Sequence, residues 1–406
     1  MAEKKVSYKR NILKQFYFSQ ALSCADLCEV MEKSLPLITK LVGELVEEGK
    51  VIETGFAPST GGRRPLMYSV KPDIQYVVAV SMDQLITRIA LMDMHNNYVG
   101  TVEKIDLPLT RNPTALPILT DTIDRFIEKQ MVDKLKIVGV GIAMPGFIDV
   151  QKGVNYSFLQ TSEGSIIQYI SDAIGLPVFI DNDSSLIALA ELRFGAAMDT
   201  KNAMVINMGW GVGLGMILDG ALYRGDNGFA GEFSHIPVFS NHTICSCGKH
   251  GCLETETSLL VLIEKTKEGL NAGRTSTLKD IAFDNPEEAN DLIIKAALAG
   301  DQFAVELLSE IGFKIGRGVA ILIHLLNPKL IVLSGRGSLA GKIWKAPIQQ
   351  ALNEHCIPRL AHNAQIAVSD LGYKAELIGA AALVMENFED IKEYTSDFVE
   401  HNIILA

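Results

Sequence analysis

The strongest constraint on the fold is the alternation of strand-like and helical runs that begins at Gln75. Apolar runs such as YVVAVSM and AMVINMG have the composition of buried strands, and longer helical runs, such as the one at about 114–131, separate them. This order is typical of a mixed or mainly parallel sheet covered by helices. The sequence therefore predicts an α/β body, and its layout suggests two lobes with a cleft between them.

The predicted elements of this body fall into two groups. The first group comprises meander-like strands at YVVAVSM, TRIALMD and YVGTVEKI, a helix at about 114–131, a strand at 136–143, a helix over Ser165–Ile174, the strand PVFID and a helix over Ser184–Phe194. The second group comprises strands at AMVINMG and LGMILDG, a cysteine-rich loop, several helices and the strand KLIVLSG. We expect each group to form one lobe.

Residues 1–70 have a different pattern, in which three short helices precede two strands. We expect the first helix over residues 7–18, a second after the capping residue Ser23, and a third from Leu35 to Glu48 after the capping residue Ser34. The strand-like runs KVIETGF and PLMYSV flank the turn APSTGGRR. Three helices and a basic-tipped hairpin are typical of a winged helix-turn-helix.

The third predicted helix has one apolar face and one face that is free to meet a partner. The apolar stripe repeats with the helical period and comprises Ile38, Leu41, Val42, Leu45 and Val46. The outer face comprises Pro36, Thr39, Lys40 and Gly43. We interpret the outer face as the surface that enters the DNA major groove, while Arg63 and Arg64 enter a minor groove or hold phosphates. The alternative is a three-helix bundle used for protein contacts.

The charge balance argues against nucleic-acid binding over the whole surface. The formal net charge is −11. Residues 1–70 nevertheless carry ten Lys/Arg against eight Asp/Glu, a local charge of +2. No apolar run approaches the ~20 residues that cross a bilayer, and the start MAEKKVSYKR leads into no signal-peptide core. We therefore expect a cytoplasmic protein without membrane insertion.

One histidine and three closely spaced cysteines have the composition of a metal site. They lie in the stretch HIPVFSNHTICSCGKHGC and are His235, Cys245, Cys247 and Cys252. One imidazole and three thiolates satisfy tetrahedral zinc with no open position, so the predicted zinc ion is structural. The alternative is a set of reduced, buried cysteines in a cytosolic loop. His242 and His250 are spare candidate ligands.

Two further stretches could hold a ligand. The glycine run at 209–215 allows close backbone approach, but it lacks the Lys-Ser/Thr of a Walker loop, and a tight hairpin explains it equally well. The DND at 181–183 ends an apolar strand and opens a helix, where ligands gather in open α/β sheets. An aspartate at this point accepts a hydroxyl proton or caps the helix. Glu232 and Glu254 flank the cysteine loop and could bind sugar hydroxyls, although exposed glutamates usually bind nothing.

Taken together, these residues resemble the ROK family, which groups bacterial repressors, open reading frames and sugar kinases. The similarity runs over essentially the whole chain. Its most specific part is GWGVGLGMILDGALYRGDNGFAGEFSHIPV followed by CSCGKHGCLE, which is similar to the family signature and its zinc loop. The N-terminal module, with GGRRP in its turn, is similar to that of the family's transcriptional regulators, and stand-alone kinases of the family lack it.

The resemblance implies an α/β fold with an actin-like (ribonuclease-H-like), two-lobed, ATPase-type body behind an N-terminal winged helix-turn-helix domain. The implied domains are a DNA-binding domain at 1–72, a first lobe at 73–190 completed by a C-terminal helix at 377–395, and a second lobe with the zinc loop at 191–376. Sugar contacts are carried over to Asn182, Asp183, Glu232, His235 and Glu254, with Asp183 at the position of the kinase base. Ser234 stands where the signature usually has glycine, which bears on ligand fit.

A second departure from the family pattern concerns ATP. Kinases of the family have a D-x-G-G-T turn after the first strand, whereas this chain has Ser81, Asp83, Gln84 and Leu85 there. Asp83 would repel phosphate, and both glycines that allow close approach are lost. Trp210 and Ser334 also replace residues that are usual in the later phosphate turns. The sequence therefore predicts that ATP use is abolished and that the chain is not an enzyme.

We accordingly expect a sugar-responsive DNA-binding transcriptional regulator, most simply a repressor of carbohydrate-utilisation genes. Its expected partners are a double-stranded DNA operator, a sugar or sugar-derivative effector, and further copies of itself in a homodimer or homotetramer. One alternative is an active kinase for a hexose or N-acetylhexosamine that also binds DNA. Another is a scaffold that answers to a protein partner instead of a sugar.

Overall fold

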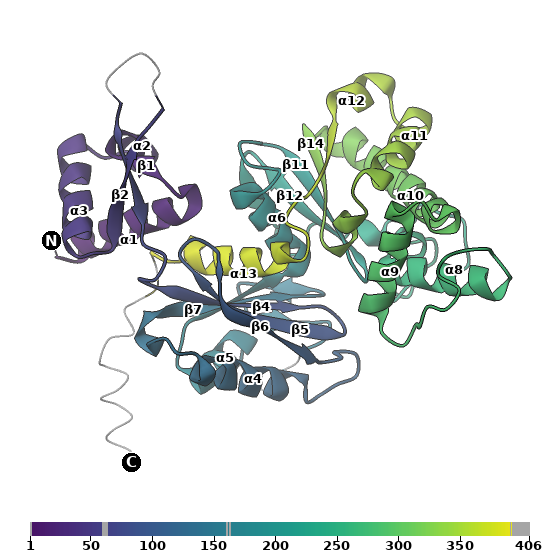
Figure 1. The fold of residues 1–406 in the computed structure, drawn as a ribbon, viewed down its shortest axis with the longest axis horizontal. Coiled ribbons are helices and arrows are strands. Elements are labelled where there is room, and N and C mark those ends of the chain that lie inside the picture. Colours follow the sequence, from purple (N-terminus) through teal and green to yellow (C-terminus); the bar gives the residue numbers. More distant parts are fainter. Residues whose placement is uncertain (1, 59–63, 160, 162–163, 390, 392–406) are drawn as a thin grey trace. The chain divides into compact units, whose positions relative to one another are not determined.

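The computed structural model describes the chain except for residues 1, 59–63, 160, 162–163, 390 and 392–406 (Figure 1). The chain divides into two compact units. Unit 1 comprises Met1–Gly146, Val150–Asp181 and Ala380–Ala406, and unit 2 comprises Phe147–Asp149 and Asn182–Gly379. This division does not separate residues 1–72 from the first lobe, so the domain boundaries expected from the sequence stay a prediction.

The N-terminal part of unit 1 has the predicted helices and hairpin, except that the first helix begins at Ala2 and not at residue 7. They are α1 (Ala2–Ser19), α2 (Cys24–Met31) and α3 (Leu35–Glu47), with a three-stranded sheet of β1 (Leu22–Ser23), β3 (Leu66–Val70) and β2 (Val51–Phe56). Ser23 caps α2 as expected, because its side chain accepts the Asp26 amide and Asp26 bonds back to the Ser23 amide. Ser34 lies at the N-cap of α3, but within the described residues its hydroxyl makes no capping bond.

The face of α3 that packs inward is the predicted one. Four members of the apolar stripe are buried, and they are Ile38, Leu41, Val42 and Leu45. Pro36 fits the first turn of the helix, which needs no backbone donor there. The outer face of α3 is exposed at Pro36, Thr39, Lys40 and Gly43. The winged helix-turn-helix therefore presents the face expected from the sequence.

Unit 1 also contains a five-stranded sheet in the order β10-β7-β4-β5-β6. The strands are β4 (Tyr76–Met82), β5 (Ile86–Asp93), β6 (Tyr98–Asp106), β7 (Ile137–Met144) and β10 (Val178–Asn182). β4, β5 and β6 are antiparallel neighbours, and β7 is parallel to β4. The helices α4 (Ala115–Lys129) and α5 (Ile166–Ile174) cover one face, and α13 (Lys374–Glu386) covers the other (Figure 1). A Cβ on Gly141 would lie 1.9 Å from the Ala380 carbonyl oxygen, so α13 packs directly on β7.

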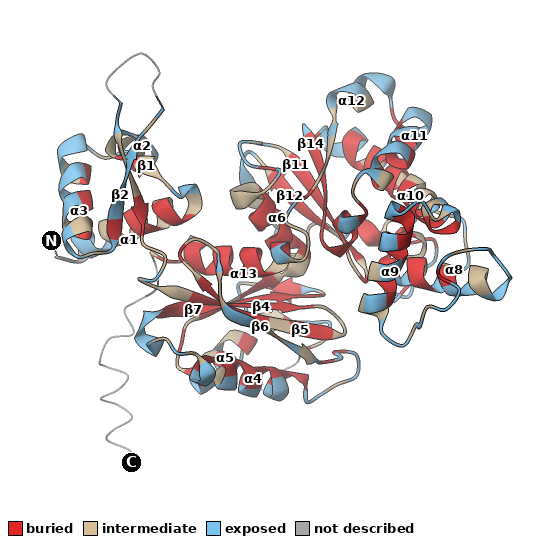
Figure 2. Cartoon of the chain, in the orientation of Figure 1, coloured by how far each residue is buried: buried red, intermediate tan, exposed pale blue. Residues whose placement is uncertain are grey.

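Unit 2 repeats this topology in the sheet order β13-β12-β11-β14-β15. The strands are β11 (Ala203–Met208), β12 (Val212–Leu218), β13 (Ala221–Tyr223), β14 (Leu330–Ser334) and β15 (Gln365–Val368). β11, β12 and β13 are antiparallel, whereas β14 is parallel to β11 and β15 is parallel to β14. Both sheets thus place a central strand between an antiparallel neighbour and a parallel neighbour, and these inner strands are largely buried (Figure 2).

The remaining elements of unit 2 are mostly helices. They are α6 (Asp183–Phe194), α7 (Glu254–Thr257), α8 (Leu259–Asn271), α9 (Pro286–Leu298), α10 (Gln302–Leu326), α11 (Lys345–His355) and α12 (Pro358–Asn363), with the 3-10 segments η2 (Phe233–His235) and η3 (Arg336–Trp344). Short pieces outside these sets are η1 (Lys134–Lys136), β8 (Ile148–Asp149) and β9 (Val154–Asn155). Among the described helices, none is both long and apolar enough to cross a membrane.

The glycine run at 209–215 serves the packing of unit 2. Met208 pairs with Val212, so Gly209, Trp210 and Gly211 form the turn of the β11–β12 hairpin. A Cβ on Gly213 would lie 1.9 Å from Ser184 Oγ, and one on Gly215 would lie 2.3 Å from the Ala188 Cβ. The absence of a side chain at Gly213 and Gly215 therefore lets α6 lie close against the hairpin.

Candidate functional site

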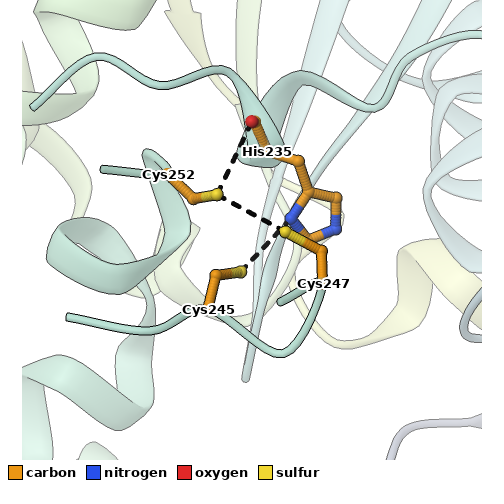
Figure 3. A group of neighbouring side chains, drawn as sticks. All are labelled: His235, Cys245, Cys247 and Cys252. Carbon is orange, nitrogen blue, oxygen red and sulfur yellow. Dashed lines mark hydrogen bonds between the residues drawn. The ribbon is translucent and has the colours of Figure 1, made fainter. Parts of the chain in front are cut away.

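The four predicted metal ligands converge in unit 2 (Figure 3). The ligating atoms of His235, Cys245, Cys247 and Cys252 all lie within 4.8 Å of one another. Cys247 Sγ is 3.6 Å from Cys252 Sγ, and His235 Nδ1 is 3.4 Å from Cys245 Sγ. Tetrahedral zinc with bonds of ~2.3 Å to sulfur holds two thiolates ~3.8 Å apart. The spacing and the donor set therefore fit a structural zinc ion.

The loop that carries the cysteines is shaped by its own backbone. The Cys245 amide donates to the Lys249 carbonyl at 2.8 Å, and Pro237 pairs with Cys252 in an isolated bridge. Gly251 has a φ of +77°, and a Cβ there would lie 2.2 Å from the Phe239 carbonyl oxygen, so this tight return requires glycine. His242 and His250 lie outside the cluster of possible ligands.

Burial disfavours ionisation of one thiol in this cluster. It raises the pKa of the Cys252 thiol to about 12, and the neighbouring Cys247 and Cys245 add to the shift. A divalent metal ion that binds the thiolate must displace this proton, so metal binding and deprotonation are linked. Cys245 and Cys252 are buried, whereas Cys247 is exposed.

Two glutamates lie beside the cluster, as the sequence suggested. Glu232 Oε2 is 3.7 Å from His235 Nε2, on the side of the imidazole away from the cysteines. Glu254 Oε1 is 3.9 Å from Cys245 Sγ, and Glu254 Oε2 accepts a hydrogen bond of 3.4 Å from the Val212 amide. Burial raises the pKa of Glu232, while His235 opposes the shift and Glu254 adds to it. The loop thus positions carboxylates as well as metal ligands.

The Asn182-Asp183 pair lies where β10 ends and α6 begins. Asn182 is the N-cap of α6, because its Oδ1 accepts the Ser184 and Ser185 amides at 2.9 and 3.1 Å. Asp183 Oδ1 accepts the Ser184 amide at 2.7 Å and the Ser184 hydroxyl at 3.1 Å. The sequence allows an aspartate as the cap of this helix, whereas the structure has Asn182 as the N-cap and Asp183 in the first turn. A ligand would have to share the pair with the helix terminus.

Ser184 connects this pair to the β11–β12 hairpin. Asn207 Nδ2 donates to Ser184 Oγ at 3.1 Å, and Asn207 Oδ1 is buried without a partner among the residues that the structure describes. Gly211, at the other end of the turn, lies against Glu254, since a Cβ there would be 2.6 Å from Glu254 Oε2. All five predicted sugar residues belong to unit 2. Ser234 is buried within η2.

The predicted DNA-binding residues are placed in part. Pro36, Thr39 and Lys40 are exposed on α3. Arg63 lies outside the described residues. Arg64 is exposed, and its guanidinium donates to the carbonyls of Ala57 at 2.7 Å and Phe56 at 3.3 Å, at the end of β2. Arg64 thus supports its own hairpin as well as facing solvent.

The turn between β4 and β5 is closed by its own aspartate. Asp83 Oδ1 accepts the Leu85 and Ile86 amides, both at 2.8 Å, and Asp83 Oδ2 lies 3.7 Å from Arg88 Nη1. The Asp83 amide in turn donates to the Ile86 carbonyl at 2.9 Å. The Asp83 carboxylate therefore accepts hydrogen bonds from backbone amides that a phosphate-binding turn would donate to its ligand.

Sequence reasoning missed one cluster, which surrounds Arg336. This side chain is only 6% exposed, and its Cζ lies 4.7 Å from the ring centroids of both Trp210 and Tyr373. Its guanidinium also pairs with Glu287 at the start of α9. The available signal was an arginine within the glycine turn SGRG after an apolar strand, which is an unusual place for a long charged side chain.

Comparison with known proteins relates this geometry to a family. The profile of the ROK family matches residues 78–387. The xylose repressor of Caldicellulosiruptor bescii is 29% identical over 397 residues, which cover 94% of this chain and 96% of that protein. A solved ROK family transcriptional regulator, described as a homologue of the E. coli MLC protein, has a TM-score of 0.74 and 26% identity and covers 95% of this chain and 97% of its own.

A kinase is similar over a shorter part. A solved ROK family glucokinase from Streptomyces griseus, in complex with glucose and AMPPNP, has a TM-score of 0.65 and 27% identity and covers 76% of this chain and 98% of its own. These likenesses confirm the expected fold, an actin-like body of the ROK type with mixed α/β sheets. An N-terminal helix-turn-helix is consistent with the regulator among them.

Proposed function

The chain belongs to the ROK family, and we propose that it is a sugar-responsive, DNA-binding repressor of carbohydrate-utilisation genes without sugar-kinase activity. One observation carries the proposal, namely how much of the chain each relative covers. The xylose repressor matches 94% of this chain, whereas the glucokinase structure matches 76%. The chain thus carries the extra length of a repressor, and its first seventy residues fold as a winged helix-turn-helix.

In this proposal residues 1–72 contact operator DNA. The exposed Pro36, Thr39 and Lys40 of α3 enter the major groove, and Arg63 and Arg64 of the turn contact a minor groove or phosphates. The body, residues 73–376 with the C-terminal helix, senses the sugar. A homodimer or homotetramer would present paired α3 helices to the two halves of a palindromic operator.

The sugar is proposed to bind Asn182, Asp183, Glu232, His235 and Glu254. This set supplies one amide, one imidazole and three carboxylates, whose donors and acceptors suit the many hydroxyls of a sugar. The carboxylates of Glu232 and Glu254 lie next to the cysteine loop, and Asp183 lies at the start of α6. Only a sugar that binds one arrangement of the protein better than another can change its affinity for DNA.

We propose that His235, Cys245, Cys247 and Cys252 hold one structural zinc ion. When bound, zinc supplies a crosslink between η2 and the cysteine loop, since four protein ligands leave no position for a substrate. The protein's own contribution is orientation. Glu232 faces Nε2 of His235, which leaves Nδ1 directed at the cysteines. The crosslink would therefore fix the glutamates that we assign to the sugar.

The proposed absence of kinase activity rests on the side chains in two turns, β4–β5 and β11–β12. Asp83 places a negative charge, held by the Leu85 and Ile86 amides, where a phosphate would need donors. Trp210 fills the middle of the β11–β12 turn and is buried. Phosphoryl transfer depends almost entirely on positioning and stabilising the phosphates of the nucleotide. Loss of the turns that contact these phosphates is therefore more damaging to kinase activity than a change in the sugar site.

The alternative is an active sugar kinase that also binds DNA. It is favoured by the retained Asn182-Asp183 pair and by the glucokinase relative, which was solved with glucose and AMPPNP. A carboxylate at Asp183 could serve as the base for an acceptor hydroxyl.

Both functions can be tested on the full-length chain. Binding sequences are first selected from random DNA, and operator affinity is then measured at fixed salt with a panel that includes xylose, glucose and N-acetylglucosamine. We expect tight operator binding that at least one sugar weakens, and no sugar phosphate after incubation with Mg·ATP. Sequence-independent DNA binding would contradict the repressor, and turnover typical of kinases, ~1 per second, would establish the alternative.

A further inference from the structure

The Arg336 cluster lies where an α/β sheet of this kind binds its ligands. β11 and β14 are parallel neighbours, with Asn207 opposite Ser334, so the turns that follow them meet at one edge of the unit 2 sheet. Ligands of open α/β sheets bind outside the carboxyl ends of parallel strands. The first turn carries Trp210 and the second carries Arg336. Trp210 and Arg336 therefore occupy space at this edge of the sheet that a ligand could otherwise fill.

The turn after β14 is locked in place. Gly335 has a φ of +71°, and a Cβ there would lie 2.2 Å from Asn207 Oδ1. A Cβ on Gly337 would lie 2.7 Å from the Met208 Cβ, and the indole of Trp344 donates to the Gly337 carbonyl at 2.7 Å. The backbone on both sides of Arg336 is thus fixed against β11, which determines where the arginine side chain can go.

The Arg336 side chain is held by two aromatic rings and one carboxylate. Its Cζ is 4.7 Å from each ring centroid, of Trp210 and Tyr373. Glu287 pairs with the guanidinium and compensates its charge, as a buried cation requires. Tyr373 is itself anchored, because its hydroxyl donates to Asp291, and burial together with this hydrogen bond raises the pKa of Tyr373.

Trp210 contributes its ring to this cluster, and not a hydrogen bond. The side chain is 5% exposed, yet its Nε1 has no hydrogen-bond partner in the described part of the chain. A buried indole usually finds an acceptor, so the position of this one is set by stacking on Arg336 rather than by a hydrogen bond. The two aromatic rings that contact the flat guanidinium offer surfaces on which a flat heteroaromatic base could also stack.

We propose that Arg336 is a built-in occupant of the slot bounded by Trp210 and Tyr373, and that it excludes adenine nucleotides from unit 2. The proposal rests on the proposed function, since it supplies a physical reason for the absence of kinase activity that is separate from the Asp83 turn. A relative with the same fold was solved with AMPPNP, so the fold accommodates an adenine nucleotide when its residues permit. In this chain the Arg336 guanidinium already occupies the ring surfaces of Trp210 and Tyr373 on which the base would stack.

The test measures nucleotide binding in the full-length protein. Mg·ATP and Mg·AMPPNP are titrated by calorimetry and by intrinsic fluorescence, which reports on this turn because the chain has two tryptophans and both Trp210 and Trp344 contact it. Arg336→Ala opens the slot, whereas Arg336→Met refills it without charge. Arg274→Ala is the matched control, since Arg274 stacks on Phe303 and pairs with Glu306 at an exposed place elsewhere in unit 2.

We expect Arg336→Ala to bind both nucleotides at least tenfold more tightly than the wild type, while Arg336→Met and Arg274→Ala stay at the wild-type level. Adding Trp210→Ala to Arg336→Ala should remove the gain. If Arg336→Ala does not fold, Glu287→Gln releases the guanidinium from its counter-charge and should give a smaller gain in the same direction.

The outcomes separate this inference from the proposed function. If neither the wild type nor a folded Arg336→Ala variant binds nucleotide, Arg336 is not the excluding residue, while a sugar-responsive repressor would still stand. If the wild type binds Mg·ATP as tightly as the variant, the slot is not closed and the inference is wrong. Formation of sugar phosphate by the wild type would overturn the proposed function as well.

Discussion

The two five-stranded sheets have the same topology, but their first hairpins end in different turns. In unit 1 the β4–β5 turn is closed by the carboxylate of Asp83, which accepts two of its own amides. In unit 2 the β11–β12 turn is closed by its backbone, because the Gly209 amide donates to the Gly211 carbonyl at 3.0 Å, and the carboxylate that accepts the next amide, of Val212, comes from Glu254 outside the turn. Side chains, rather than topology, decide what each sheet edge can bind.

The difference also separates the proposed tasks of the units. Unit 1 contains the winged helix-turn-helix and a closed turn, whereas unit 2 contains the cysteine loop and all five candidate sugar residues. Changes in unit 2 are therefore expected to alter stability and sugar response, and changes in unit 1 to alter DNA binding.

The largest effect should come from breaking the metal cluster. Cys252→Ser replaces a buried thiol ligand, so we expect the bound zinc to fall from about one equivalent to near none and the free energy of unfolding to fall by about 3 kcal/mol or more. Elemental analysis and denaturant unfolding measure the two quantities. The control is Cys356→Ser, a buried thiol outside the cluster. The site would be refuted if the wild type were purified without zinc and Cys252→Ser had the same free energy of unfolding as the wild type.

Asp183→Asn should come next, with an effect confined to the sugar. A hydrogen bond to a charged group contributes about 1.5–3 kcal/mol, so sugar affinity should fall by about tenfold or more. Operator affinity without sugar should stay unchanged, as measured by anisotropy. Asp219→Asn, in the exposed β12–β13 turn of the same unit, is the control. Equal loss of operator affinity would show that the two units are not separable in this way.

The exposed face of α3 should give a smaller effect, confined to DNA. Thr39→Ala and Lys40→Ala should each change which operators are preferred, by about 1–3 kcal/mol for a contacted base pair. Competition against a library of operators at fixed salt measures both. Lys279→Ala, which removes an exposed lysine of unit 2 outside the proposed DNA surface, serves as a control. Loss of sugar binding in either variant would contradict the division between the units.

The smallest effect should come from the unit 1 turn itself. Asp83→Ala removes the acceptor of two amides and should lower the free energy of unfolding by about 1 kcal/mol, without any gain in Mg·ATP binding. Asp93→Ala is a matched control, because Asp93 Oδ1 accepts the His95 and Asn97 amides in the β5–β6 turn. If Asp83→Ala alone restored nucleotide binding, the unit 2 turn would not be closed.

Local patterns in the sequence predicted much of this arrangement. Ser23 as a cap, the buried stripe of α3 and the spacing of the three cysteines depend on neighbours within a few residues, and the structure has them as expected. Ser34 shows the limit of such rules, since a capping residue type at the right position makes no capping bond within the described chain.

The Arg336 cluster could not be predicted because its partners are far apart in the sequence. Trp210 follows β11, Glu287 begins α9 and Tyr373 precedes α13, and they meet only when β14 pairs with β11. Arg64 is similar, because the hairpin carbonyls that it contacts become available only when β2 and β3 pair. In both cases the tertiary structure determines which groups the long cationic side chain contacts.

The central claim is that a sugar changes operator affinity without being phosphorylated. The most direct test is one anisotropy titration of operator-bound, full-length protein with the responsive sugar, carried out with and without Mg·ATP, followed by an assay of sugar phosphate in the same samples. We expect identical release curves and no sugar phosphate. A curve that requires Mg·ATP, or sugar phosphate that accumulates as the operator is released, would contradict the account.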